Sequence, residues 1–163
     1  LLKILRNNKN YFGISRTISH LGFGLLILFI GLNHNFSIEK DFNIKVGEKK
    51  SFETYVINFN SLELEKRKNH QAIIGNFYFF NNKDKVGEEF NPEIRIYKQP
   101  ETLTYEASIR TKLSHDLYLT MSNIDKSDFY NIKFQKKPFM IWIWLSAIMI
   151  SIGGFIRLFQ NEN

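Results

Sequence analysis

The chain has 163 residues, a net charge of +6, 44% hydrophobic residues and no cysteine. Without cysteine, a disulfide framework, a CxxC zinc site and a thiol nucleophile are all excluded. Basic residues are interspersed with Glu and Asp, as in residues 49–55 (KKSFETY) and 62–68 (LELEKRK). The positive charge therefore lacks the continuous basic stripe typical of nucleic-acid-binding proteins, and we expect no nucleic-acid partner.

Residues 1–13 form a basic segment that contains Lys3, Arg6 and Lys9 and no acidic residue. Positive residues beside a membrane span mark the cytoplasmic side, or the matrix side in a mitochondrion. The chain does not begin with Met, and no cleavage site follows the apolar run after this segment. We therefore read it as part of a longer polypeptide and not as a signal peptide.

Residues 14–35 are predicted to form a transmembrane helix, with an apolar run from Ile14 to Leu32. A span needs roughly 20 mostly apolar residues at about 1.5 Å rise each. Arg16 is the only fixed charge in the run, and His20 lies within it. Because lipid offers no hydrogen-bond partner to an imidazole, His20 is a candidate metal or haem ligand or a candidate proton carrier.

A structural role for His20 is the alternative: a packing histidine bonded to a neighbouring serine or carbonyl. Gly24 and Gly31 follow it by four and eleven residues and so share its helical face. Glycines there leave space for a flat group such as haem or for a second helix. His34 lies in the polar exit of the helix, where a headgroup-level side chain and a ligand role both stay open.

Residues 36–136 are predicted to form a small all-β domain, either a sandwich or a barrel. Apolar and polar residues alternate at 41–47, 54–60, 93–98, 116–121 and 130–134, as expected of half-buried strands. Residues 71–80 are apolar on both faces and indicate a central strand. Turn residues at 47–50, 66–69, 81–85 and 125–128 separate these runs. Residues 101–111 fit a strand or a short helix.

Residues 137–159 are predicted to form the second transmembrane helix, followed by an inner-side tail at 160–163. Aromatic residues near its start, Phe139, Trp142 and Trp144, suit the outer membrane interface. Small residues at Ala147, Ser151 and Gly154 predict a face for another helix. The expected topology is inside, helix, external β-domain, helix, inside.

Catalytic patterns are scarce in this sequence. It contains no HExxH, no GxSxG and no Gly-rich phosphate loop. His70 and His115 lie in charged segments and are predicted to be solvated. A transmembrane haem with two histidine ligands needs one from each of two helices, so the second ligand to a haem on His20 would come from elsewhere.

Several blocks of sequence occur in the same order as in a known family. They are His20–Gly22 (HLG), Ser37–Asp41 (SIEKD) and Lys137–Trp144 (KPFMIWIW). With the residues between them, from about residue 15 to 159, they resemble the C-terminal part of the CcmF family. These are haem-lyase subunits of cytochrome c maturation, with the NrfE proteins as relatives.

This resemblance implies that His20 is an axial ligand of the iron of a transmembrane haem b, thought to pass electrons to a second haem awaiting attachment. The family's tryptophan-rich loop, its two external histidines and its other transmembrane ligand are expected upstream of residue 1. No catalytic residue is therefore assigned within this chain, and whether it is itself an enzyme stays open. The implied partners are haem, the rest of the lyase subunit, other maturation subunits, apocytochrome c and the lipid bilayer.

The implied location is the bacterial or mitochondrial inner membrane, with the β-domain on the periplasmic or intermembrane-space side. A competing hypothesis is a non-catalytic interaction module, in which two helices anchor the β-domain and His20 only packs. A fragment of a proton-translocating subunit is a third hypothesis. It is disfavoured because no intramembrane Asp, Glu or Lys accompanies His20.

Overall fold

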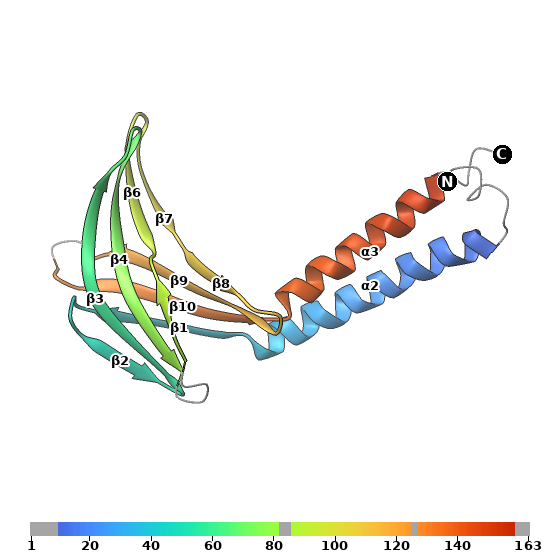
Figure 1. The fold of residues 1–163 in the computed structure, drawn as a ribbon, viewed down its shortest axis with the longest axis horizontal. Helices are drawn as coiled ribbons and strands as arrows, with labels where there is room; N and C mark the ends of the chain where they lie inside the picture. The colour runs from blue at the N-terminus through green and yellow to red at the C-terminus, as the bar shows by residue number, and fades with distance from the viewer. Residues whose placement is uncertain (1–9, 82–85, 125–126, 159–163) are drawn as a thin grey trace. The chain divides into compact units, whose positions relative to one another are not determined.

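The computed structural model describes residues 10–81, 86–124 and 127–158. Its elements are α2 (Asn10–Phe36), β1 (Ile38–Ile44), β2 (Lys49–Phe52), β3 (Tyr55–Lys66), β4 (His70–Asn81), β5 (Val86–Phe90), β6 (Glu93–Lys98), β7 (Glu101–Glu106), β8 (Ser108–Thr111), β9 (His115–Asn123), β10 (Tyr130–Pro138) and α3 (Met140–Leu158) (Figure 1). The chain divides into two compact units. One contains both helices and residues 112–116, and the other contains residues 38–111 and 117–136.

The two helices lie side by side and antiparallel (Figure 1). Among the described residues, Gly13–Phe36 and Met140–Leu158 are long and apolar enough to cross a membrane. Small residues allow their close approach. A Cβ at Gly22 would lie 3.0 Å from Ile150 Cγ1, and one at Gly153 would collide with the hydroxyl of Ser19. Ser15 Oγ, which is buried, donates a 2.8 Å hydrogen bond to the Gly153 carbonyl.

The two helices are joined by side-chain contacts where α2 ends and α3 begins. The Asn33 amide donates to the Pro138 carbonyl, which ties the last turn of α2 to the residues before α3. The Phe29 ring lies 5.8 Å, centroid to centroid, from the rings of both Phe139 and Trp142. The Trp142 indole also donates a 3.1 Å hydrogen bond to the Leu113 carbonyl. The chain therefore leaves and re-enters the helix pair at the same end.

The second unit is a β-sandwich of two sheets. One has the strand order β1-β10-β9-β8, and the other has the order β2-β3-β4-β6-β7, with β5 also paired to β4. The prediction of a central strand over residues 71–80 is confirmed, because β4 pairs with β3, β5 and β6. Residues 101–111 form strands β7 and β8, not a helix. Of the two predicted all-β folds, the chain adopts the sandwich.

The sandwich core is aromatic and follows the predicted alternation. Phe59 and Phe77 stack with ring centroids 4.2 Å apart, and Phe79 stacks on Phe134 at 4.9 Å. The fully buried large side chains are those of Phe59, Phe77, Phe79, Phe90, Phe134, Ile44, Ile57, Ile94, Leu119, Met121, Ile132 and Pro92. Val46 departs from the prediction and is 45% exposed, because β1 ends at Ile44 and Val46 lies beyond its last pair.

The predicted turns are present where the structure describes them. Gly47 has a φ of +85°, a conformation that glycine adopts without steric cost, at the turn before β2. Residues 67–69 connect β3 to β4. Parts of the turns predicted at 81–85 and 125–128 lie outside the described residues, as do most of the basic segment at 1–13 and the tail at 160–163.

Candidate functional site

The candidate site is the face of α2 that carries His20. His20 is exposed, and the contact with α3 is made by another side of the helix, where Ser15 and Gly22 are buried. Because 3.6 residues complete a turn, residues 20, 24 and 31 point in nearly the same direction, away from α3. Within this chain, the imidazole lies on the open side of the helix pair.

Gly24 and Gly31 add no side chain to that open side, where Ile27, seven residues after His20, lies between them and is 57% exposed. A Cβ at either glycine would meet nothing within 4 Å. Gly22 differs, because α3 already occupies the space beside it. The face therefore offers one nitrogen ligand, His20, and two positions, Gly24 and Gly31, that carry no side chain.

His20 makes no hydrogen bond within the part of the chain that the structure describes. Its neighbour Ser19 is directed toward Gly153, where a side chain would collide with the Ser19 hydroxyl. The structural alternative of an imidazole bonded to a serine or a carbonyl therefore has no support in the described α2–α3 pair. A neutral imidazole in hydrocarbon needs a partner, and the nitrogen donor and the open space beside it would fit a haem iron.

The contact face of α3 differs by one residue from the predicted small-residue face. α2 packs against Ser146 and Gly153, which are both buried. Ser151 and Gly154 are exposed, and a Cβ at Gly154 would meet nothing within 4 Å. The prediction did not say which helix packs on that face, and α2 uses the adjacent one, because small residues occur on two adjacent faces of α3.

The other histidines lie apart from His20. His34 is exposed in the last turn of α2. The predictions of solvated His70 and His115 are wrong, because both side chains are half-buried. The His70 ring lies 4.9 Å from the Tyr97 ring on the neighbouring strand, and His115 Nδ1 is 2.8 Å from Ser114 Oγ. No group of three His, Asp or Glu residues able to hold a metal ion occurs among the described residues.

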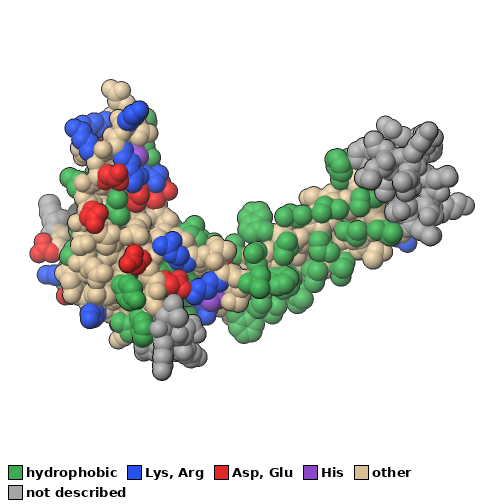
Figure 2. All heavy atoms as spheres, viewed as in Figure 1, with side chains coloured by type: hydrophobic (Ala, Val, Ile, Leu, Met, Phe, Trp, Pro, Cys, Tyr) green, Lys and Arg blue, Asp and Glu red, His purple; other side chains and the backbone are tan. Residues whose placement is uncertain are grey.

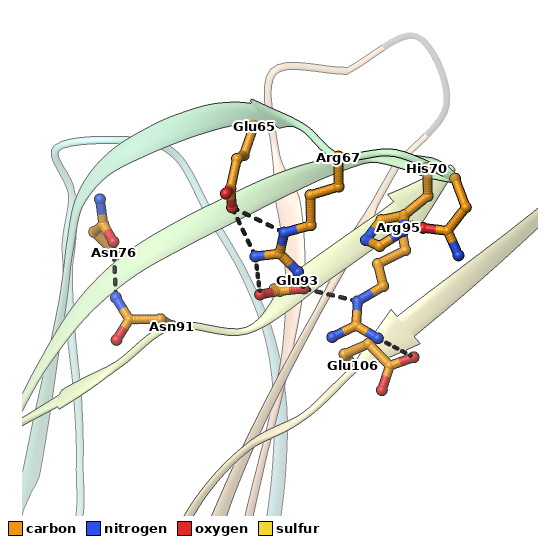
Figure 3. Close-up of polar contacts among 9 residues, drawn as sticks. Glu65, Arg67, His70, Asn76, Asn91, Glu93, Arg95 and Glu106 are labelled. Atoms are coloured by element: carbon orange, nitrogen blue, oxygen red, sulfur yellow. Dashed lines mark hydrogen bonds and ion pairs between the residues drawn. The ribbon is translucent and has the colours of Figure 1, made fainter. Parts of the chain in front are cut away.

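A network of charged side chains lies on one face of the six-stranded sheet (Figure 3). Arg67 donates to both oxygens of Glu93, at 3.1 and 3.0 Å, and Arg95 Nε donates to Glu93 at 2.7 Å. Arg67 also donates to Glu65 at 2.7 Å. Sequence reasoning missed this network, because Arg67 and Glu93 lie far apart in the sequence and only the pairing of β4 with β6 brings them together.

The network changes the ionisation of its central carboxyl. Burial raises the pKa of Glu93, but the hydrogen bonds from Arg67 and Arg95 outweigh burial and hold the pKa below its usual value. The hydrogen bonds that Arg67 donates to Glu65 and Glu93 in turn raise the pKa of Arg67. Glu93 is therefore ionised at neutral pH, and the positive charges of Arg67 and Arg95 balance its negative charge. This arrangement is that of a structural ion network.

The chain is similar to known proteins over both its strands and its helices. Residues 35–138 match the family described as the CcmF C-terminal beta-sandwich. The chain is 29% identical over 146 residues to the cytochrome c-type biogenesis protein CcmF of Haemophilus influenzae, covering 89% of this chain and 22% of that protein. It is 25% identical over 160 residues to the CcmF of Escherichia coli, covering 98% of this chain and 25% of that protein.

The fold is also similar to that of a solved structure. The cytochrome c haem lyase CcmF superposes with a TM-score of 0.71 at 14% identity, over 91% of this chain and 25% of that protein. The chain thus spans about a quarter or less of the length of the proteins it resembles. Both the matched β-sandwich and the order of the helices around it lead to one conclusion: the chain belongs to the CcmF family and corresponds to its C-terminal part.

Proposed function

We propose that this chain is the C-terminal part of a cytochrome c haem lyase and that His20 supplies one axial ligand to the iron of a transmembrane haem b. The observation that carries the proposal is an imidazole on an apolar helix, without a hydrogen bond among the described residues, beside two open glycine positions. When bound, the haem supplies one-electron transfer. A second ligand to the iron would come from another part of the protein.

The roles of the chain's own residues follow from the helix packing. Ser15, Gly22 and Gly153 hold α2 against α3 and so fix which side of α2 is turned outward. His20 presents a ring nitrogen on that side. Gly24 and Gly31 add no side chain there, so that a flat macrocycle or a further helix would fit close to the backbone at these two positions, beside Ile27.

The β-sandwich is proposed to lie on the periplasmic or intermembrane-space side, where it assists haem attachment to apocytochrome c. Two features support this orientation. Arg16 and Arg157 lie in the first turns of α2 and the last turn of α3, which is the same end of the antiparallel pair. That end carries both arginines of the helices, whereas Lys136 and Lys137 precede α3 at the other end, where the chain enters and leaves the sandwich. The proposed membrane is the bacterial or mitochondrial inner membrane.

Optical spectra of the complete complex, purified from native membranes, test the proposal. His20→Ala is expected to abolish or strongly weaken the b-type absorption of the reduced sample, because one axial ligand is lost. His34→Ala is the matched control, since it removes the other histidine of α2 from an exposed position in the last turn. Added imidazole is expected to restore part of the spectrum of His20→Ala by filling the vacated position.

An unchanged b-type spectrum in His20→Ala, at normal levels of the complex, would contradict the haem-ligand role. The function that would then remain is the membrane-anchored interaction module, with the β-sandwich as its working part.

A further inference from the structure

One end of the six-stranded sheet concentrates positive charge. The β3–β4 and β6–β7 turns lie beside each other there, because β4 pairs with β6 and His70 lies opposite Tyr97. A cleft of about 440 Å³ lies between the turns, lined by residues 66–71 and 98–99. Figure 2 shows Lys and Arg side chains gathered at this end of the sheet.

Three of the cations in this cleft form no ion pair among the residues that the structure describes, although the strand register places Glu101 opposite Lys98. The lining includes no carboxylate and four basic side chains, those of Lys66, Arg67, Lys68 and Lys98. Arg67 is engaged by Glu65 and Glu93. The three lysines form no ion pair within the described ranges. Unpaired like charges around a concave surface produce a positive potential that attracts anions.

An exposed apolar strip lies next to the lysines. The register places Leu64, Ile73, Ile94 and Tyr105 in one row across four strands, and Lys66, Gln71, Ile96 and Leu103 in the next row. Residues directly opposite in antiparallel strands point to the same face. Leu64 on β3 is 73% exposed but is separated from β7 by Ile73 and the buried Ile94, so the name apolar strip is kept for Leu103 and Tyr105 on β7, which are each 45% exposed.

Lys66 and Lys98 lie at the turn end of the same sheet face as the apolar strip. Lys66 and Lys98 follow Leu64 and Ile96 by two residues, so each points to the same face as the strip. The strip also adjoins a free sheet edge, because β7 ends the sheet and no described strand pairs with its outer side. A free edge offers backbone groups to an extended segment.

We propose that this end of the sheet binds an extended, acidic and partly apolar segment of a partner protein. Carboxylates of the segment lie in the cleft near Lys66, Lys68 and Lys98, and its alternate apolar side chains cover the apolar strip. The combination selects a peptide over a small inorganic anion, because an inorganic anion would leave the strip exposed. The inference shares no residue with the haem site, so each can fail without the other.

Fluorescence anisotropy with the full chain in phosphatidylcholine nanodiscs tests the inference. The probe is a fluorescein-labelled peptide that alternates Glu with Val. A peptide alternating Gln with Val removes the charge, and one alternating Glu with Ser removes the apolar side chains. We expect the Glu–Val peptide to bind, the Gln–Val peptide not to bind, and the Glu–Ser peptide to bind severalfold more weakly.

Variants locate the binding. Lys66→Gln with Lys98→Gln is expected to weaken the Glu–Val peptide roughly tenfold, since two charge contacts are lost. Lys49→Gln with Lys50→Gln removes the same charge from β2, at the opposite edge of the same sheet, and is expected to change affinity less than about twofold. Leu103→Ser is expected to weaken binding severalfold. Circular dichroism checks that each variant keeps its β-structure.

The inference is overturned if the Glu–Val peptide does not bind. It is equally overturned if the two lysine pairs lower affinity by the same factor, or if the Glu–Ser peptide binds as tightly as the Glu–Val peptide. Either of those two results would show that the peptide is attracted to the basic protein in general and does not bind at the proposed site.

Discussion

At the scale of single residues, Glu93 determines how the six-stranded sheet responds to acid. Its side chain is 16% exposed and accepts hydrogen bonds from two arginines. A carboxyl whose pKa is depressed on folding stabilises the protein above the pKa of the unfolded chain. That contribution is lost as the pH falls through the folded pKa. Glu93 therefore stabilises the sandwich at neutral pH and ceases to do so in acid.

We predict that Glu93→Gln lowers the free energy of unfolding of the sandwich by about 1 kcal/mol at neutral pH, because charged hydrogen bonds are replaced by weaker ones. The difference from the parent chain should shrink as the pH falls below the usual range of a glutamate. Denaturant unfolding at several pH values measures it. Glu101→Gln on β7 is the control, since Glu101 is exposed and forms no ion pair among the described residues. A pH-independent difference would contradict the assigned ionisation.

At the scale of elements, the α2–α3 contact depends on which small residues of α3 face α2. We predict that Gly153→Leu destabilises the helix pair by about 1–3 kcal/mol, because its side chain would overlap Ser19 and the Ser15 carbonyl. Gly154→Leu is the adjacent control, and we expect a change below about 0.5 kcal/mol because its surroundings are open. Thermal unfolding in nanodiscs, followed by tryptophan emission, compares the two variants. Equal effects would show that the contact face is assigned wrongly.

The sequence predicts elements better than it predicts contacts between them. Hydrophobic length identified both helices, and alternation identified the inward residues of β3, β9 and β10, because these patterns are local. The contact face of α3 was missed by one residue, since small side chains lie on two neighbouring faces. The partial burial of His70 was missed for a related reason. It depends on Tyr97, which reaches His70 only through strand pairing.

The candidate site was predictable to the same extent. The shared face of His20, Gly24 and Gly31 follows from helical periodicity alone. Whether the space beside Gly24 and Gly31 is empty depends on the face of α2 against which α3 packs, and no local sequence pattern specifies that face. The basic cleft was not predictable at all, because its lysines come from two turns that are brought together by the pairing of β4 with β6.

At the scale of the whole molecule, the chain consists of two units, each with its own stabilising contacts. The chain contains two tryptophans, Trp142 and Trp144, both in α3, so tryptophan emission reports on the helix unit alone. We predict that Phe59→Ala lowers the stability of the sandwich by about 3–5 kcal/mol, because it removes a fully buried ring stacked on Phe77. Near-ultraviolet circular dichroism of the tyrosines should then change at lower denaturant, while the tryptophan transition stays in place. A joint shift of both signals would contradict independent units.

The central claim is that His20 binds haem iron, and the reduction potential of the b-type haem tests it most directly. His20→Met replaces one nitrogen ligand by a thioether, which raises the potential of a six-coordinate haem. Potentiometric titration of the complete complex should therefore show a higher potential in His20→Met and an unchanged potential in His34→Met. A potential that stays the same in His20→Met, with the haem retained, would contradict the proposed ligation.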